Sequence, residues 1–156
     1  MKITCILVPT DLSPFGEVGV RAAADLAHRL GAELTLFHVV PGNELETLVN
    51  AHIPRHPVDL IYHDLAVSLM DQFRRVAPPE VRRHLRVQPL VTVGNPVAEI
   101  LRAAQVKSAD MIVLATHGRT GLTRMVLGSV AEQVVRRAPC PVLTVRPAEA
   151  MVGAEA

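Results

Sequence analysis

Short apolar runs of strand length alternate with segments of helical period along the chain, and this alternation constrains the fold more than any other feature. The runs fall at residues 3–9, 33–40, 85–93, 110–115 and 141–145. Strands separated by helices form βαβ units, whose strands lie parallel in one sheet. The pattern therefore predicts an α/β fold, with an open five-stranded parallel sheet and helices on both faces.

Signals for the start and the end of helices lie between these runs. Ser13 and Asn95, each followed by a proline, are typical N-caps, and Gly31 is a typical helix end. Ser129, followed three residues later by Glu132, forms a capping-box pattern in which each side chain satisfies a free backbone N–H. The sequence thus predicts that Ser129 caps the last helix.

The helical segments also carry apolar stripes of the kind that usually faces a core. The stripe of the first helix consists of Phe15, Val18, Ala22, Leu26 and Leu30. In the last helix, we expect Val130, Val134 and Val135 to face inward.

Two prolines indicate the order of the strands. Pro89 lies inside the third apolar run and Pro141 begins the fifth. Proline cannot donate to a sheet ladder, so it is restricted to edge strands and strand starts. With the third and fifth strands at the edges, the Rossmann-like order 3-2-1-4-5 fits better than the flavodoxin-like order 2-1-3-4-5. In that order, a crevice opens between the carboxyl ends of strands one and four.

Composition limits the classes of protein to consider. The chain has 156 residues, of which 49% are hydrophobic and 20% charged, with a net charge of +1. We expect one globular domain over residues 1–147 and a flexible tail at 148–156. No apolar segment approaches the roughly 20 residues that span a bilayer, and Cys5 and Cys140 fit reduced thiols of a cytoplasmic protein.

Nucleic acid is not an expected partner, because the net charge is near zero and only three Phe and one Tyr could stack on bases. A local basic cluster is typical of solvated helix ends, and we favour this interpretation over binding to nucleic acid or an acidic partner. The cluster consists of Arg74, Arg75, Arg82, Arg83 and Arg86.

Three histidines, His52, His56 and His63, are close in sequence and raise the question of a metal site. Histidines four residues apart share a face only within a helix, and Pro54 and Pro57 argue against a continuous helix there. Scattered loop histidines are therefore the favoured interpretation.

The loop ATHGRTGLTRMVLGS, residues 115–129, follows the fourth apolar run and borders the predicted crevice. Gly118, Gly121 and Gly128 let the backbone approach a ligand, and the next helix presents free N–H groups suited to phosphate. Across the crevice, Asp11 could accept hydrogen bonds from a ribose or hold a phosphate-bound metal ion. These features outline a nucleotide site. The alternative is that the glycines only form a turn and Ser129 only caps a helix.

Three known catalytic or nucleotide motifs do not fit. A P-loop needs a lysine before its Ser or Thr, but Lys2 and Lys107 both precede strands at the opposite end of the sheet. The first strand–helix turn, PTDLS, has no glycine of a dinucleotide fingerprint. Ser129 lacks the second glycine of a hydrolase nucleophile elbow. We therefore predict no catalytic residue, and any nucleotide hydrolysis should be slow.

The sequence resembles the universal stress protein family over residues 3–146, through VPTDLS, LFHVV and ATHGRTGLTRMVLGSVAEQVVRRAPCPVLTV. The ATP-binding branch of that family has the spacing G-x2-G-x9-G-(S/T), which falls here on Ala115, Gly118, Gly128 and Ser129. Alanine thus replaces the first glycine. Its methyl group adds volume near the ligand, and alanine resists positive φ.

The resemblance implies a set of nucleotide-binding residues. Asp11 and its neighbours would line the adenosine, Val39 would meet the adenine, and the glycine loop would hold the phosphates. The full set is Pro9, Thr10, Asp11, Val39, Leu114, Ala115, Gly118, Gly128, Ser129 and Val130. The implied ligand is ATP, with or without Mg²⁺, and the implied role is a dimeric binding or signalling module in the cytoplasm.

Two other functions stay open. One is a family member that binds no nucleotide and works through dimerisation and partner contacts. The other is a slow, metal-dependent nucleotide hydrolase that uses Asp11.

The fifth apolar run, PVLTV, indicates a homodimer. An apolar edge strand left open is a template for pairing with another chain, and two-fold pairing of two copies removes that hazard. The family resemblance also implies such dimers. We expect Val142, Leu143 and Val145 at or near the contact.

Overall fold

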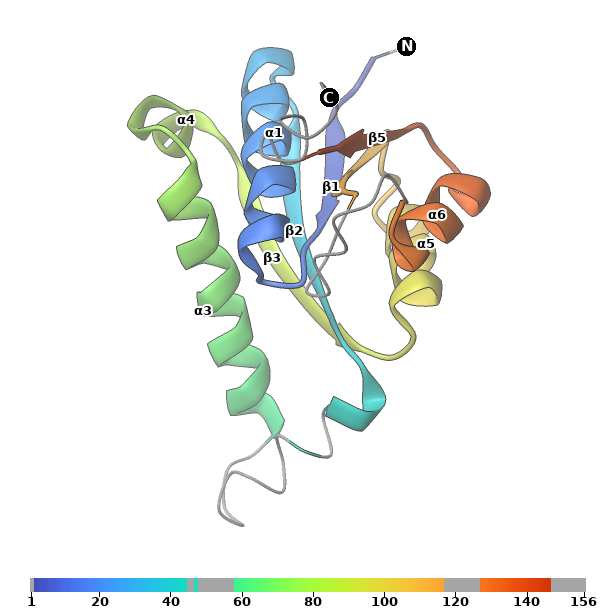
Figure 1. The fold of residues 1–156 in the computed structure, drawn as a ribbon. Helices are drawn as coiled ribbons and strands as arrows, with labels where there is room; N and C mark the ends of the chain where they lie inside the picture. The colour runs from blue at the N-terminus through green and yellow to red at the C-terminus, as the bar shows by residue number, and fades with distance from the viewer. Residues whose placement is uncertain (1, 45–46, 48–57, 117–126, 147–156) are drawn as a thin grey trace, which may run out of the picture.

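A parallel sheet of five strands in the order β3-β2-β1-β4-β5 organises the computed structural model, as predicted from the proline positions (Figure 1). The structure describes residues 2–44, 47, 58–116 and 127–146. The strands are β1 (Cys5–Pro9), β2 (Glu33–Val40), β3 (Val87–Val93), β4 (Met111–Ala115) and β5 (Val142–Val145). The helices are α1 (Pro14–Leu30), α3 (Val58–Val76), α4 (Pro79–His84), α5 (Pro96–Val106) and α6 (Ser129–Arg137).

Helices cover both faces of the sheet, as predicted (Figure 1). Helices α1, α3 and α4 lie on one face, and α5 and α6 on the other. Successive strand residues point to opposite faces, so Ile6 and Val8 enter the core under α1 while Leu7 enters the core under α5 and α6. The chain runs from β1 outward through β2 to β3, and then crosses to β4 and β5 on the other side. The carboxyl ends of β1 and β4 therefore border the switch point.

For α1, the prediction that the stripe of larger apolar residues faces the core is wrong. The buried face consists of Gly16, Gly19, Val20, Ala23, Ala24 and Ala27, whereas Leu30 is 46% exposed. Small residues let the helix lie close to the sheet: a Cβ on Gly19 would lie 3.1 Å from the Ala115 nitrogen. Ala22 and Leu26 pack only partly buried along the sides of this contact.

Two of the three predicted caps are confirmed. The Ser13 side chain accepts a hydrogen bond from Gly16 N at 3.2 Å, and Asn95 Oδ1 accepts one from Ala98 N at 3.1 Å. The predicted end of α1 is also confirmed, because Gly31 adopts the left-handed conformation with φ of 65°.

The prediction of a capping box at Ser129 is wrong. The N-cap is Gly128, whose carbonyl accepts the first helical bond from Glu132 N at 2.9 Å, so Ser129 is the first residue inside the helix. No side chain caps α6. The prediction that Val135 faces inward is also wrong, because its side chain is 44% exposed, while its neighbour Val134 is fully buried as predicted.

Cys5 and Cys140 are both reduced and half-buried at the amino end of the sheet, opposite the switch point. Burial raises the pKa of both thiols, and the nearby Asp110 carboxylate raises it further. A protonated thiol is a poor nucleophile, so the reactive thiolate form is disfavoured at both positions. None of the helices in the described ranges is long and apolar enough to cross a membrane.

Candidate functional site

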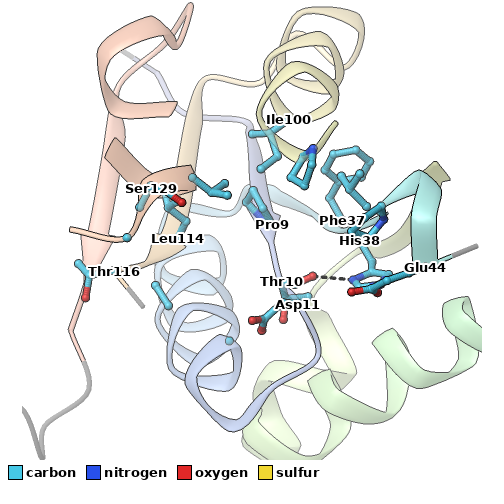
Figure 2. A pocket seen from close by; sticks show the side chains of 18 residues that line it. Pro9, Thr10, Asp11, Phe37, His38, Glu44, Ile100, Leu114, Thr116 and Ser129 are labelled. Atoms are coloured by element: carbon cyan, nitrogen blue, oxygen red, sulfur yellow. Dashed lines mark hydrogen bonds between the residues drawn. The ribbon is translucent and has the colours of Figure 1, made fainter. Parts of the chain in front are cut away.

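A cavity of about 330 Å³ opens at the switch point, where β1 and β4 end (Figure 2). Its walls come from the carboxyl ends of β1, β2 and β4 and from the first turns of α1, α5 and α6. Nine of the ten predicted site residues line it: Pro9, Thr10, Asp11, Val39, Leu114, Ala115, Gly128, Ser129 and Val130. Gly118 lies outside the described residues. The structure thus brings the predicted residues together, and their role in binding a nucleotide stays a prediction.

The turn between β1 and α1 holds Asp11 at the cavity. Asp11 Oδ1 accepts hydrogen bonds from the Ser13 amide at 3.0 Å and from the Ser13 hydroxyl. Leu12 lies between them with φ of 64°, in the left-handed region that a leucine rarely adopts. Its amide donates to Thr10 Oγ1 at 3.2 Å. The carboxylate is therefore fixed by a tight and strained turn.

Gly16 lets the first turn of α1 pass close to this loop. A Cβ at position 16 would lie 2.5 Å from Thr10 Oγ1 and 2.9 Å from Asp11 Oδ1. Real Cβ atoms do not approach oxygen this closely, so any side chain here would displace the turn.

Two hydrogen bonds connect the backbone of Thr10 to β2. Its amide donates to the Phe37 carbonyl at 2.8 Å, and His38 Nδ1 lies 2.8 Å from the Thr10 carbonyl (Figure 2). A carbonyl only accepts, so Nδ1 carries the proton in this contact. Both Thr10 and His38 are buried.

On the opposite wall, Gly128 leads the chain into α6. Its amide donates to the Thr116 carbonyl at 2.8 Å, and a Cβ on Gly128 would lie 3.0 Å from that oxygen. The first amides of α6, at Ser129, Val130 and Ala131, have no acceptor within the helix because four N–H groups are unsatisfied at every helix start. All three residues line the cavity. A helix start of this kind suits an anion.

Ala115, in the place of the first family glycine, is the last residue of β4. Among the described residues, only Leu12 and Ser108 combine a side chain with positive φ, so Ala115 needs no left-handed backbone. Gly19 makes room beside it, since a Cβ on Gly19 would lie 3.7 Å from the Ala115 methyl group. The methyl group therefore causes no backbone strain at this position.

Comparison with known proteins identifies the family. The sequence model of the universal stress protein family matches residues 3–146. This chain belongs to the universal stress protein family. It is 32% identical over 141 residues to universal stress protein MJ0531 of Methanocaldococcus jannaschii, a match that covers 90% of this chain and 81% of the relative.

Solved structures confirm the fold of this universal stress protein. The structure of MJ0577, also from Methanocaldococcus jannaschii, superposes with a TM-score of 0.71 at 25% identity and covers 94% of this chain and 98% of that chain. A universal stress protein in complex with cAMP has a TM-score of 0.66 at 20% identity, covering 94% and 98%. One from Archaeoglobus fulgidus in complex with dAMP has 0.61 at 22%, covering 92% and 98%.

Sequence reasoning missed several residues that line the cavity of this universal stress protein. Phe37 and His38 lie next to Val39 near the carboxyl end of β2, so their position in the predicted strand could have indicated that they line the cavity. Pro96 and Ile100 come from α5, which packs against β2 on the face of the sheet opposite α1. No local sequence pattern predicts that these two residues line the cavity. The other missed residues are Gly16, Pro41, Glu44, Thr116 and Ala131.

The charged side chains of the described lining are the carboxylates of Asp11 and Glu44, and no Lys or Arg belongs to that part of the wall. Arg119 and Arg124, which the sequence places in the glycine loop of residues 115–129, lie outside the described residues. Within the described ranges, no three His, Cys, Asp or Glu side chains could together hold a metal ion. Of the histidine trio, His52 and His56 fall outside those ranges, and His63 is exposed on α3.

Most of the basic cluster forms ion pairs at the surface. Arg74 contacts Asp71 at 2.9 Å, Arg75 contacts Glu17 at 2.9 Å, and Arg86 contacts Glu33 at 3.1 Å. These pairs are largely exposed, in keeping with solvated helix ends and loops.

Proposed function

We propose that this universal stress protein binds an adenine nucleotide, ATP, in the cavity between β1 and β4 and acts as a dimeric binding or signalling module in the cytoplasm. The observation that carries the proposal is the meeting of Asp11, Val39 and the start of α6 around one cavity. The cAMP and dAMP complexes of related folds support an adenine compound as the ligand.

Each wall suits one part of the nucleotide. Val39, Phe37 and Ile100 offer apolar surface on which an adenine ring can be buried. The Asp11 carboxylate accepts hydrogen bonds from ribose hydroxyls. The amides of Ser129 and Val130 donate to the phosphates, and the Ser129 hydroxyl, which caps no helix, lies beside them.

Charge balance favours ATP together with Mg²⁺. Asp11 and Glu44 place two carboxylates in the described lining, which would repel a free polyphosphate. Mg²⁺ typically binds through one or two protein carboxylates and the phosphates of the substrate, so Asp11 would suffice from the protein side. The ion would reduce repulsion between the carboxylates and the phosphates.

A direct test is to denature the purified protein and separate the supernatant by nucleotide chromatography, then titrate ligand-free protein with ATP and Mg²⁺ by calorimetry. Released or titratable ATP near one equivalent supports the proposal. Absence of both release and binding heat at millimolar ATP contradicts it and favours a family member that acts through dimerisation and partner contacts. Release of ADP with steady turnover in Mg²⁺ favours the hydrolase.

Replacement of Gly128 by Val should abolish ATP binding. The new side chain meets the Thr116 carbonyl beside the start of α6, where even a Cβ would lie 3.0 Å from the oxygen. The clash would displace the amides proposed to bind the phosphates. Gly42→Val is the matched control, because a Cβ at Gly42 has nothing within 4 Å. Unchanged affinity of folded Gly128→Val would place the ligand elsewhere.

The dimer part of the proposal concerns β5. This strand is a sheet edge and leaves Leu143 40% exposed, with Val142 and Val145 half-buried beside it. Pairing of two copies along this edge would cover the exposed Leu143 and satisfy the open ladder.

A further inference from the structure

Gln72 of α3 is a fully buried polar side chain that does not line the cavity. It lies 62 residues from the turn that holds Asp11, yet it bonds to that turn twice. Its Oε1 accepts from the Thr10 hydroxyl at 2.8 Å, and its Nε2 donates to the Ser13 carbonyl at 3.2 Å. We infer that Gln72 is a positioning residue that fixes the Asp11 carboxylate through Thr10 and Ser13, which lie on either side of it in the turn.

The two bonds act on the two ends of the turn. Thr10 Oγ1 donates to Gln72 and accepts from the Leu12 amide, so its orientation depends on both partners. Ser13 contacts Asp11 Oδ1 through its amide and its hydroxyl, and its carbonyl accepts from Gln72. A shift of either end therefore moves the carboxylate.

Strain at Leu12 explains why such support is needed. A non-glycine residue at φ of 64° persists only where the surrounding structure over-determines it. Buried hydrogen bonds provide that restraint, since a buried amide side chain that loses its partners leaves polar groups unsatisfied. Gln72, which is 0% exposed, supplies the restraint from a different helix.

The consequence rests on the proposed function: Gln72 tunes nucleotide affinity without touching the ligand. It also couples α3 to the cavity. If Asp11 holds the ribose or Mg²⁺, a bound nucleotide stabilises the turn and, through Gln72, the last turns of α3. Such coupling is reciprocal by thermodynamic necessity, so changes in the packing of α3 alter the affinity for nucleotide.

Replacement of Gln72 by Met tests the inference, because methionine keeps the length of the side chain and loses both hydrogen bonds. The matched control is Leu69→Met, also fully buried one turn earlier on α3. In ligand-free protein, we expect about tenfold faster hydrogen exchange at the Leu12 and Ser13 amides in Gln72→Met than in Leu69→Met, measured by NMR at matched global stability. For ATP with Mg²⁺, we expect Kd to rise about tenfold, as from one misplaced polar contact.

The two readouts separate the two ideas. Wild-type protein that binds no ATP contradicts the proposed function, while hydrogen exchange at Leu12 and Ser13 still tests the role of Gln72. Unchanged exchange in Gln72→Met overturns the inference, and so does faster exchange with an unchanged Kd. If Gln72→Met does not fold, Thr10→Val breaks the same bond from the other side. Exchange is then read at the Ser13 amide, which bonds to Asp11, and should become faster by a similar factor, because Thr10→Val also removes the acceptor of the Leu12 amide.

Discussion

Glycine at position 16 decides whether the turn that carries Asp11 can form as it does. Two effects oppose each other there. Alanine in place of glycine within a helix gains about 0.5–1 kcal/mol of stability from backbone propensity. A new Cβ at 2.5 Å from the buried Thr10 hydroxyl oxygen forces displacement, and overpacking of this kind costs about 1–3 kcal/mol. The steric term is the larger one.

We therefore expect Gly16→Ala to lower the free energy of unfolding by about 1 kcal/mol and to weaken ATP binding, since Asp11 Oδ1 lies 2.9 Å from the same Cβ. Urea unfolding and calorimetry measure the two effects. Gly42→Ala, a helical position with open space around its Cβ, should leave ATP binding unchanged and should not lower the free energy of unfolding. A more stable Gly16→Ala variant would mean that the turn relaxes easily.

At the scale of elements, Asp110 joins the amino ends of β1 and β4. Its Oδ2 accepts three hydrogen bonds, from Thr4 N at 2.7 Å, from Thr4 Oγ1 at 2.8 Å and from Cys5 N at 3.0 Å. These bonds, the Thr4 amide first, hold the pKa of the Asp110 carboxyl below its ordinary value. Because β1 and β4 also frame the cavity at their other ends, this contact helps to set the register of the site.

The lowered pKa sets the sign of a pH dependence. A carboxylate with a depressed pKa in the folded state contributes stability above its unfolded pKa of about 3.9, and that contribution is lost as pH falls through the folded value. Asp110→Asn should therefore have a lower Tm than the wild type at pH 7, and the difference should shrink below about pH 4. Thermal unfolding from pH 7 to pH 3 measures this.

The control for this experiment is Asp25→Asn, which removes only an exposed ion pair with Arg29 and should change Tm little at any pH. A constant Tm difference for Asp110→Asn across the whole range would show that the loss is one of packing and not of charge.

For the whole molecule, the open edge at β5 is the feature that invites a second copy. The other edge strand, β3, contains Pro89, which blocks one position of its ladder, and exposes Gln88. The short β5 has no proline within its bounds and presents Leu143 to solvent. The two edges therefore differ in their capacity to pair.

We expect the wild type to sediment as a dimer at micromolar concentration and Leu143→Asp to sediment as a monomer, because a charge at the centre of the paired edge would be buried. Leu30→Asp is the matched control, since Leu30 is similarly exposed at the end of α1. Analytical ultracentrifugation measures the mass. A wild-type monomer, or a dimer that survives Leu143→Asp, would rule out this interface.

Much of the architecture and of the candidate site could be predicted from local sequence. The alternation of apolar runs set the order of strands and helices, and Pro89 and Pro141 indicated the edges. Because parallel strands end at the same edge of a sheet, their terminal residues converge at the switch point without further information. The residues predicted on β1, β2 and β4 accordingly line one cavity.

The sequence by itself determined the strand order and the edge of the sheet where the cavity lies, because periodicity and the backbone limits of proline act within a few residues. Only the tertiary structure decided which face of α1 is buried, that Gln72 bonds to the Asp11 turn, and that Ile100 of α5 lines the cavity. These features depend on contacts between residues far apart in the chain, such as the 62 residues that separate Thr10 from Gln72. No local pattern encodes such contacts, since they arise from how closely small and large side chains let whole helices approach the sheet.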